Sequence, residues 1–407
     1  MNTIDAALTD EQRAARELAL RFATEQVAPR AAEIDRDDVF PQDLYTRMAD
    51  LGLLGINIPE EYGGSGADEL TTCLIMEELA RRSGTVANAL LLAKLQSELI
   101  MRAGNEDQRR NYVPDIVSGR RICLIAVTEP DAGTDVASIR TTATRQDGGW
   151  VLNGTKAFMT AGAVGDVAVV LARTSSDPGN ASLTTFLVEK SPNGDPGRGF
   201  VVGHKDELMG MRGLGTAGIV LQNTVVADSA VLGETGRGFQ NVMRSFDNGR
   251  IVIACLALGL AVGALDASLT YARERVAFGR TIENFQAVQL MLADMVVDTQ
   301  AARLLIHHAA QMKDQGRSYS SEASMAKLFA SDIAVRTAAN AVQVHGGYGY
   351  TKEAVVERIY RDAKLTQIYE GTNQIQRVII SRDALQGRSG GSGTSRTNNA
   401  SKESKRA

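Results

Sequence analysis

The chain has 407 residues, of which 44% are hydrophobic and 23% are charged, and its formal net charge at pH 7 is −4. This length is sufficient for two or three domains that share a large core. The small net charge argues against nucleic acid or a membrane surface as the main partner. The N-terminus lacks a signal-peptide pattern, and no apolar run is long enough for a transmembrane helix, so we expect no membrane insertion.

Cysteine and histidine usage points away from a disulfide scaffold and from a metal site. Cys73, Cys123 and Cys255 lie far apart in apolar segments, which is typical of reduced core residues in a cytoplasmic protein. His307 and His308 are the one close pair of histidines, and adjacent helical positions point about 100° apart. Because such a pair holds a metal poorly, the sequence predicts no metal site.

Residues 1–120 have a helical pattern. The spacing of Thr9 and Gln12 indicates a capping box at the start of a helix. Buried helices are expected over 70–81 and 86–101 because apolar residues recur there at helical spacing.

From residue 121 to 232 the pattern changes to short β-rich runs separated by Gly, Asn, Asp and Pro. One separator, Asn153-Gly154, is a strong signal for a hairpin turn. Five or more short strands in this region predict an antiparallel sandwich or barrel.

Residues 233–387 return to long helical patterns, which are interrupted near Phe278-Gly279 and Gly346-Gly347. Helices followed by strands and then by helices indicate an α+β fold, in which a small β domain lies between two helical blocks. The tail at 388–407 contains no large apolar side chain and is predicted to be disordered.

The segment 368–377 carries the strongest chemical signal. It places Glu370 on a short turn, and Thr372 then has the position of a helix N-cap. The apolar residues that follow at helical spacing would dock this helix on a core: Ile375, Val378, Ile379 and Leu385. Burial of the turn would raise the pKa of the Glu370 carboxyl from about 4.3 towards neutrality, which suits a general base. The alternative is an ordinary capped helix start with a solvated glutamate.

Two segments near the strands have both a functional and a structural interpretation. The turn 127–135 follows an apolar strand and offers backbone N–H groups and hydroxyls to a polar ligand, although Pro and Gly turns are common at strand ends. Phe158 beside Thr160 suits a stacked heteroaromatic ring with one hydrogen-bonding edge, and it equally suits a half-buried strand.

The C-terminal block contains three further motifs with two interpretations each. Asp247 and Arg250 could touch a ligand or pair with each other at i and i+3. The segment 273–279 has the basic residues and the glycine of an ordinary helix end. The glycine-rich segment 343–349 could likewise end a helix, or its backbone could form a nest for a pyrophosphate.

Together, the order and spacing of these motifs resemble the acyl-CoA dehydrogenase family from about Thr9 to Leu385, especially its short- and medium-chain members. The resemblance implies an N-terminal helical domain (1–120), a middle β domain (121–232) and a C-terminal four-helix-bundle domain (233–387). It also implies bound FAD and a homotetramer.

The resemblance implies site residues position by position, with Glu370 as the catalytic base. The positions that match FAD contacts within one subunit are Ile125, Val127, Thr128, Gly133, Thr134, Phe158, Met159, Thr160, Thr372, Asn373 and Gln374. The positions that match contacts to the FAD of a partner subunit are Arg275, Phe278, Phe285, Gln286, Gln343, Val344, Gly346 and Gly347. The positions that match acyl-CoA contacts are Thr134, Asp247, Arg250, Gly371 and Arg382.

The implied reaction introduces a trans double bond between the α and β carbons of an acyl thioester. Glu370 would remove the α-proton while the β-hydride passes to FAD, and the electrons would then pass to an electron-transfer flavoprotein. Several positions depart from the family pattern, and in the turn after the strand Asp131 replaces a usual glycine and Thr134 a usual serine. Phe158 replaces a frequent tryptophan and should still stack. Some members carry the base on the helix that contains Asp247, but the corresponding residue here is Gly249, which leaves Glu370 as the single base.

The acyl group is less well defined by the sequence. Bulky side chains in the helix at 86–101 favour a short or branched chain: Leu90, Leu91, Leu92 and Leu95. On the same helix, Lys94, Gln96 and Arg102 leave open a polar or dicarboxylic acyl group, although a solvated helix face is the alternative. Three other interpretations stay open: a carrier-protein thioester as substrate, an oxygen-using flavoenzyme such as an acyl-CoA oxidase, and a non-catalytic acyl-CoA-binding protein.

Overall fold

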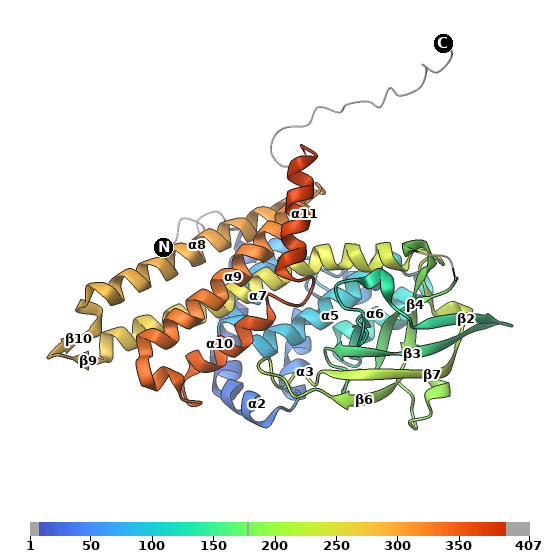
Figure 1. Cartoon of the computed structure of the whole chain (residues 1–407), viewed down its shortest axis with the longest axis horizontal. Coiled ribbons are helices and arrows are strands. Elements are labelled where there is room, and N and C mark those ends of the chain that lie inside the picture. Colours follow the sequence, from blue (N-terminus) through green and yellow to red (C-terminus); the bar gives the residue numbers. More distant parts are fainter. Residues whose placement is uncertain (1–7, 177–178, 388–407) are drawn as a thin grey trace, which may run out of the picture.

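A computed structural model describes residues 8–176 and 179–387, and the predicted disordered tail at 388–407 lies outside them. The chain forms a block of helices, then a β-sheet, then a second block of helices (Figure 1). The predicted α+β class is therefore confirmed. The proposed boundaries, 120/121 and 232/233, fall in the connections between these blocks.

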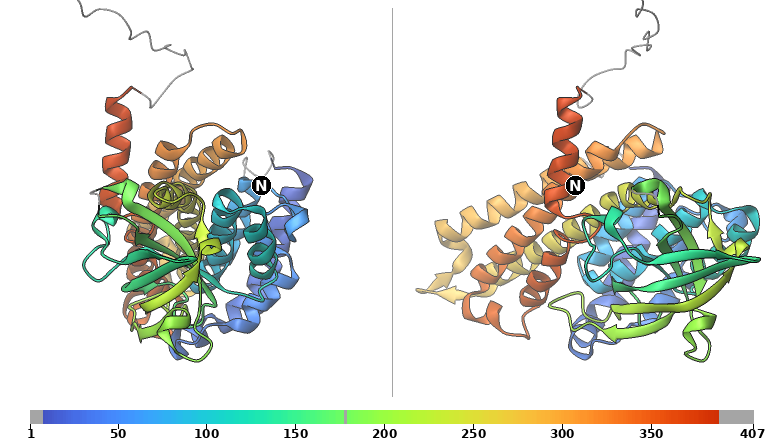
Figure 2. Two further views of the ribbon diagram at one scale, coloured as in Figure 1. Left: turned by 90° about the vertical axis from the view of Figure 1, so that its right-hand side faces the viewer. Right: turned by 45° about the vertical axis from the view of Figure 1, so that its right-hand side comes forward.

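The N-terminal block consists of helices that pack along one side of the sheet (Figure 2). They are α1 (Asp10–Phe22), α2 (Ala31–Asp37), α3 (Gln42–Asp50), α4 (Glu69–Ala80), α5 (Gly84–Ala103) and α6 (Glu106–Val117). The predicted capping box is confirmed, because the side chains of Thr9 and Gln12 each accept a hydrogen bond from the other's backbone N–H. α4 and α5 are the predicted buried helices, and α5 packs between α4 and α6.

The sheet has eight strands in the order β6-β7-β3-β2-β4-β5-β8, with β1 paired to β4. The strands are β1 (Cys123–Ala126), β2 (Thr142–Gln146), β3 (Gly149–Met159), β4 (Val167–Arg173), β5 (Leu183–Glu189), β6 (Val201–Lys205), β7 (Ala217–Ala227) and β8 (Val231–Leu232). Most pairs are antiparallel, but β4 runs parallel to β1 and β2, which corrects the predicted antiparallel arrangement. The β2–β3 hairpin lies between β1 and β4 in the chain, and it provides the crossover that a parallel pair requires.

The prediction of a hairpin turn at Asn153-Gly154 is wrong. The β2–β3 hairpin turns at Asp147-Gly148, and Gly154 lies inside β3, beside an irregularity in the pairing of β3 with β7. Gly154 has φ +157°, and a Cβ at this position would collide with Thr141. The glycine therefore permits a close approach between backbones within the sheet rather than a reversal of the chain.

The C-terminal block contains the long helices of the molecule. The elements are α7 (Gly238–Glu274), β9 (Val276–Ala277), β10 (Arg280–Thr281), α8 (Gln286–Asp314), α9 (Ser320–His345), α10 (Val355–Leu365) and α11 (Asn373–Leu385). The two predicted interruptions are confirmed, since α7 ends before Phe278 and α9 ends at His345. α7 and α9 pack against each other and each also packs against α8 and α10, which forms the predicted bundle.

Helix α7 corrects the expectation that no segment is apolar enough to span a membrane. By length and composition alone it qualifies, but 89% of its most apolar stretch is buried inside the molecule. It packs against α4 and α5 as well as α8 and α9, so it is the central helix that joins the two helical blocks. The three cysteines are free and buried, as predicted.

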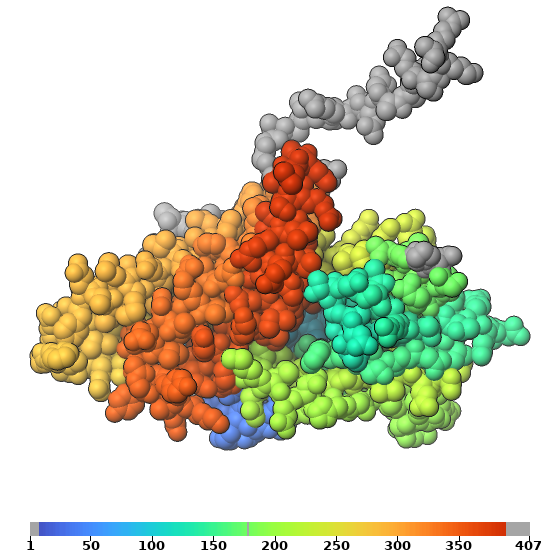
Figure 3. All heavy atoms as spheres, viewed as in Figure 1, coloured from blue at the N-terminus to red at the C-terminus, as the bar shows by residue number. Residues whose placement is uncertain are grey.

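Helix α11 docks on its own chain only in part, which corrects a second expectation: it contacts α9, and Ile375 and Ile379 are half-buried, but the other two apolar residues of the predicted face are exposed. It projects from the body of the molecule (Figures 1 and 3). Val378 and Leu385 are 47% and 88% exposed, and the buried residues of the helix are the polar Asn373 and Gln376. Apolar spacing predicts that a face is buried, but it does not tell whether the covering surface belongs to the same chain.

Candidate active site

Glu370 lies on the turn between α10 and α11. Glu370 and Gly371 both have left-handed backbones, with φ of +53° and +89°. Such a conformation is uncommon for a residue with a side chain, and in folded proteins it marks sites that the surroundings hold in place. Thr372 accepts a hydrogen bond from the backbone N–H of Ile375 at 3.4 Å, so the predicted helix cap is confirmed.

The Glu370 carboxyl is buried and has little hydrogen bonding. Its Oε2 atom has no hydrogen-bond partner among the residues that the structure describes. Burial raises the pKa of Glu370 to about 7, against the opposing charges of Arg250 and Lys327. Such a carboxylate can be ionised at neutral pH and still accept a proton, which is the requirement for a general base. The alternative of a solvated glutamate is wrong.

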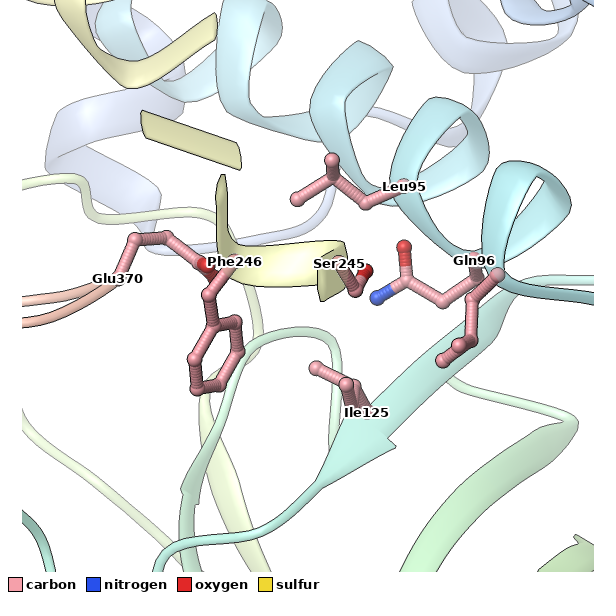
Figure 4. A pocket seen from close by; sticks show the side chains of 7 residues that line it. Leu95, Gln96, Ile125, Ser245, Phe246 and Glu370 are labelled. Carbon is pink, nitrogen blue, oxygen red and sulfur yellow. The ribbon is translucent and has the colours of Figure 1, made fainter. Parts of the chain in front are cut away.

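Glu370 is one of the residues that line a narrow crevice, whose side chains are drawn in Figure 4. It is lined by Leu95, Gln96 and Leu99 of α5, Ile125 of β1, Ser245 and Phe246 of α7, and Glu370. Its empty volume is about 190 Å³, and it is too narrow for a water molecule. The three blocks of the fold therefore meet at the carboxyl group, and each contributes to the lining.

Gly249 of α7 provides the space that the carboxyl occupies. A Cβ at this position would lie 2.7 Å from Oε2 of Glu370 and 3.3 Å from Cδ1 of Leu95. A glycine is therefore required here because the Glu370 carboxyl approaches the helix backbone so closely, although glycine is intrinsically unfavourable inside a helix.

Asp247 and Arg250, two predicted acyl-CoA contacts, are hydrogen-bonded to each other. Arg250 is buried, and Asp247 also accepts a hydrogen bond from the Ser320 hydroxyl at 2.9 Å. The i, i+3 pairing that the spacing allowed is therefore present. It also holds the Arg250 charge close enough to Glu370 to lower the pKa of that carboxyl.

The turn after β1 is held by a buried ion pair. The Glu129 carboxylate accepts hydrogen bonds from Lys156 Nζ at 2.9 Å and from the backbone N–H groups of Arg140 and Thr141. Lys156 also donates to the Val127 carbonyl oxygen at 3.0 Å. The turn is thus fixed from inside, while Gly133 and Thr134 at its tip are exposed.

Phe158, Met159 and Thr160 lie at the end of β3, next to this turn. The backbone N–H of Ala157 donates to the Thr128 carbonyl oxygen at 2.9 Å, which joins the two segments. Met159 is buried, but Phe158 is 62% exposed and has φ +60°. An aromatic ring held outward by a strained backbone suits a planar ligand better than it suits the core.

The segments predicted to touch a partner's FAD lie at the end of the molecule away from the sheet, around the C-terminal end of α7 and the strands β9 and β10 (Figure 1). An open groove with an empty volume of about 760 Å³ is lined there by Tyr271, Arg275, Ile282, Val344, His345, Gly346, Gly347, Tyr348 and Thr351. Phe278 is 96% exposed, and its ring meets Phe285 edge to face at 6.0 Å between centroids. Gln286 and Gln343 are exposed near the groove.

The predicted FAD contacts therefore form two separate groups. Gly249 beside Glu370 and Arg275 at the groove are separated by about 26 residues of helix, which correspond to about 40 Å. The groove offers an arginine and the open backbone of Gly346 and Gly347, where an added Cβ would meet nothing within 4 Å. These features suit a diphosphate, and Phe158 with the turn after β1 suits a planar ring system. The donor set thus fits FAD, but one copy of the chain does not bring both groups together.

The remaining predicted residues lie on or beside α11. Gln374 and Arg382 are exposed, whereas the Asn373 side chain is buried and bonded to Lys327, Ser331 and Asp332. Among the described residues no group of three histidine, cysteine or acidic side chains is arranged to hold a metal.

Three residues that line the crevice were missed from the sequence, namely Leu99, Ser245 and Phe246, and two residues of α5 were misread. Ser245 and Phe246 precede the predicted Asp247 and carried no signal of their own. One interpretation placed Lys94 and Gln96 on a solvated helix face. That interpretation is wrong for both residues, because each is only 2% exposed. Of the four leucines expected at the acyl pocket, only Leu95 lines the crevice.

Three sequence profiles match the chain in succession. "Acyl-CoA dehydrogenase, N-terminal domain" matches residues 9–120, "Acyl-CoA dehydrogenase, middle domain" matches residues 124–224, and "Acyl-CoA dehydrogenase, C-terminal domain" matches residues 236–385.

Individual relatives align over nearly the whole chain. A Bacillus subtilis protein named "Acyl-CoA dehydrogenase" is 42% identical over 381 residues, which cover 93% of this chain and 99% of that protein. "Caffeyl-CoA reductase-Etf complex subunit CarC" of Acetobacterium woodii is 38% identical and covers 92% of this chain and 98% of its own. The structure of butyryl-CoA dehydrogenase from Megasphaera elsdenii superposes with a TM-score of 0.89 at 38% identity, covering 93% of this chain and 99% of the other.

Proposed function

The chain belongs to the acyl-CoA dehydrogenase family, and from this premise we propose that it introduces an α,β double bond into short-chain acyl-CoA thioesters, with Glu370 as the base. The observation that carries the assignment is the position of the buried Glu370 carboxylate among the residues that line a mostly apolar crevice. The test is whether butyryl-CoA is oxidised by the protein and reduces its flavin.

The enzyme is an FAD-dependent oxidoreductase, and bound FAD supplies the acceptor for the β-hydride. The chain itself supplies the base and its surroundings. The crevice as described is too narrow even for water, so an acyl group would have to widen it. The bound acyl chain would then keep water away from Glu370, and this further desolvation raises the carboxyl pKa and so its affinity for the α-proton. Arg250 and Lys327 act in the opposite direction and help to keep the carboxyl ionised before the substrate binds.

Phe158 is the aromatic side chain that we assign to the flavin ring. Phe158→Ala is expected to weaken FAD binding about fivefold, because a stacked aromatic contact contributes about 1 kcal/mol. The exposed ring supports little of the core, so the melting temperature of the apoprotein should stay the same. Fluorescence titration of the apoprotein with FAD measures the affinity. Phe158→Tyr is the matched control and should bind FAD normally, whereas unchanged FAD affinity in the alanine variant would refute the assignment.

The crevice favours a short, uncharged acyl group. None of the lining residues that the structure describes is cationic. Lys94 is not available to a second carboxylate, because it donates to Glu69 at 3.0 Å and to Glu98 at 2.7 Å. Arg102 donates to the Asn241 carbonyl oxygen.

We therefore expect kcat/KM for butyryl-CoA to exceed that for glutaryl-CoA about 100-fold or more, since an unpaired buried carboxylate is costly. Initial rates with both thioesters and one artificial electron acceptor check this expectation. Equal values would refute the assignment of an uncharged acyl group but would leave the reaction class intact.

We infer that the working enzyme contains more than one copy of the chain, in keeping with the predicted homotetramer. Two observations support the inference. Arg275 at the groove lies about 40 Å along α7 from Gly249, which adjoins the base, and large apolar side chains of α8 are exposed: Leu290, Val297 and Leu304. An electron-transfer flavoprotein is the proposed electron acceptor, which is supported by the relative named as a subunit of an Etf complex.

A further inference from the structure

A buried lysine lies behind the turn that carries Glu370. Lys327 of α9 has no exposed surface and is not among the residues that line the crevice. Its Nζ donates to the carbonyl oxygen of Gly371 at 2.9 Å and to Oδ1 of Asn373 at 2.8 Å. A lysine is rarely buried so completely, because removing its charge from water is costly unless partners compensate.

The bonds of Lys327 belong to a network that ties the turn to α9. The Asn373 side chain donates to Ser331 at 2.9 Å and to Asp332 at 2.7 Å. On the other side, the Gln376 side chain donates to the same Gly371 carbonyl at 2.9 Å. The carbonyl immediately after the base is thus held by two donors, one from α9 and one from α11.

The hydrogen bonds from Lys327 and Gln376 are made to the strained part of the turn. Glu370 and Gly371 are consecutive residues with left-handed backbones, so the turn persists only where its surroundings hold it. The Glu370 carboxyl has no hydrogen bond of its own at Oε2. Its direction is therefore set by the backbone of the turn, and Lys327 supplies one of the two side-chain bonds to that backbone at Gly371.

Lys327 also places a positive charge near the carboxyl. The charged groups around Glu370 are Arg250 with its partner Asp247 on α7, and Lys327 with Asp332 on α9. Burial lowers the pKa of Lys327 to about 7, while the nearby Glu370 raises it. Lysine and glutamate thus favour each other's charged form around neutral pH.

We propose that Lys327 is a positioning residue for the base: it holds the Glu370–Gly371 turn through the Gly371 carbonyl and keeps a positive charge behind the carboxylate. This inference rests on the proposed role of Glu370. Lys327 touches neither the substrate crevice nor the reacting atoms, so it acts through the geometry and ionisation of Glu370.

Two substitutions separate the hydrogen bond from the charge. Lys327→Met removes both, and kcat with butyryl-CoA should fall about 10- to 100-fold, as expected when a catalytic group is displaced by a fraction of its working distance. Lys327→Gln keeps an N–H donor for the Gly371 carbonyl but no charge, so its loss of kcat should be smaller. In both variants the acidic limb of the kcat–pH profile should move up by about one pH unit, because the loss of a nearby positive charge raises the pKa of Glu370.

Ser331→Ala is the matched control, since it removes a hydroxyl of the same network and leaves the lysine in place. Its pH limb should not move. FAD content and melting temperature are measured for every variant, because a purely structural lysine would lower these two quantities without moving the limb.

The outcomes test the role of Lys327 separately from the proposed function of the protein. Failure of the wild-type protein to oxidise butyryl-CoA would overturn the function itself. An active wild type with a Lys327→Met variant whose kcat stays within about twofold, and whose limb stays in place, would overturn only the positioning role. If Lys327→Met loses its flavin, the kcat and the pH limb of Lys327→Gln test the positioning role instead. Loss of flavin from both variants would show that the lysine is needed for folding and would overturn the proposal.

Discussion

Glu370→Gln is expected to lower kcat with butyryl-CoA about 10³-fold or more while the variant retains its FAD. Glutamine has nearly the same shape as glutamate but cannot accept a proton at neutral pH. No second carboxylate takes over, because Glu370 is the one acidic side chain among the described residues that line the crevice. Position 249, where some family members carry the base, is a glycine. Steady-state kinetics and the flavin absorbance of the purified variant measure both quantities.

The same substitution has an expected signature in stability. The pKa of Glu370 is about 7 in the folded protein, above its ordinary value of 4.5. The folded state therefore binds more protons than the unfolded state between these two values, and the carboxyl destabilises the protein increasingly as the pH rises from about 4.5 to 7. Glu370→Gln should melt near the wild-type temperature at pH 4.5 and above it at pH 8.

Glu370→Asp is the control that keeps a carboxylate and shortens its reach, so it should retain partial activity. Near-normal turnover by Glu370→Gln would show that another group removes the α-proton. A loss of activity accompanied by a loss of FAD would also fail to support the assignment, since the substitution is expected to leave the cofactor site intact.

Gly249→Ala is expected to lower kcat about 10- to 100-fold without lowering stability. The added methyl group would lie 2.7 Å from Oε2 of Glu370, which is closer than such atoms can approach. The nearest obstruction is the end of a side chain, so the carboxyl can turn away and the fold can survive. Alanine is also intrinsically favoured over glycine within a helix by about 1 kcal/mol. The base would therefore be displaced in a protein that remains folded.

Gly259→Ala in the same helix is the matched comparison. A Cβ there would lie 2.6 Å from the backbone carbonyl oxygen of Glu77 on α4, an atom that cannot move away cheaply. This variant should melt at a lower temperature, by the equivalent of about 1–3 kcal/mol, but its folded fraction should keep a normal kcat. A Gly249→Ala enzyme with unaltered kcat would mean that the carboxyl does not occupy the position described for it.

The features that the sequence predicted well are local or were carried by the family resemblance. The caps at Thr9 and Thr372 depend on residues three positions apart, so the spacing alone predicted them. The periodicity of apolar residues changes from helical to strand-like and back along the chain, and this change predicted the fold class. Glu370 was found because the residues around it resemble a known motif, whereas its place before a helix left both a buried and a solvated carboxyl open.

The features that the sequence did not predict depend on distant contacts. Lys327 meets the base turn across 44 positions, and no pattern near residue 327 indicates this contact. Asn153-Gly154 has the composition of a turn, but it lies within β3, whose pairing with β7 involves residues distant in sequence. The exposure of apolar residues on α11 was not predicted, because the sequence does not tell which surface covers them. The proposed role of the residues around Arg275 in a site shared between copies of the chain rests on the family resemblance, because no pattern near Arg275 indicates a partner.

The visible spectrum of the purified protein during anaerobic addition of butyryl-CoA tests the central claim most directly. The account predicts the absorbance of an oxidised flavin, which bleaches when butyryl-CoA is added to the wild-type protein and persists in the Glu370→Gln variant. Isobutyryl-, octanoyl- and glutaryl-CoA, added separately, rank the acyl groups. Bound flavin that none of these thioesters bleaches, or no bound flavin after FAD is supplied, would contradict the account.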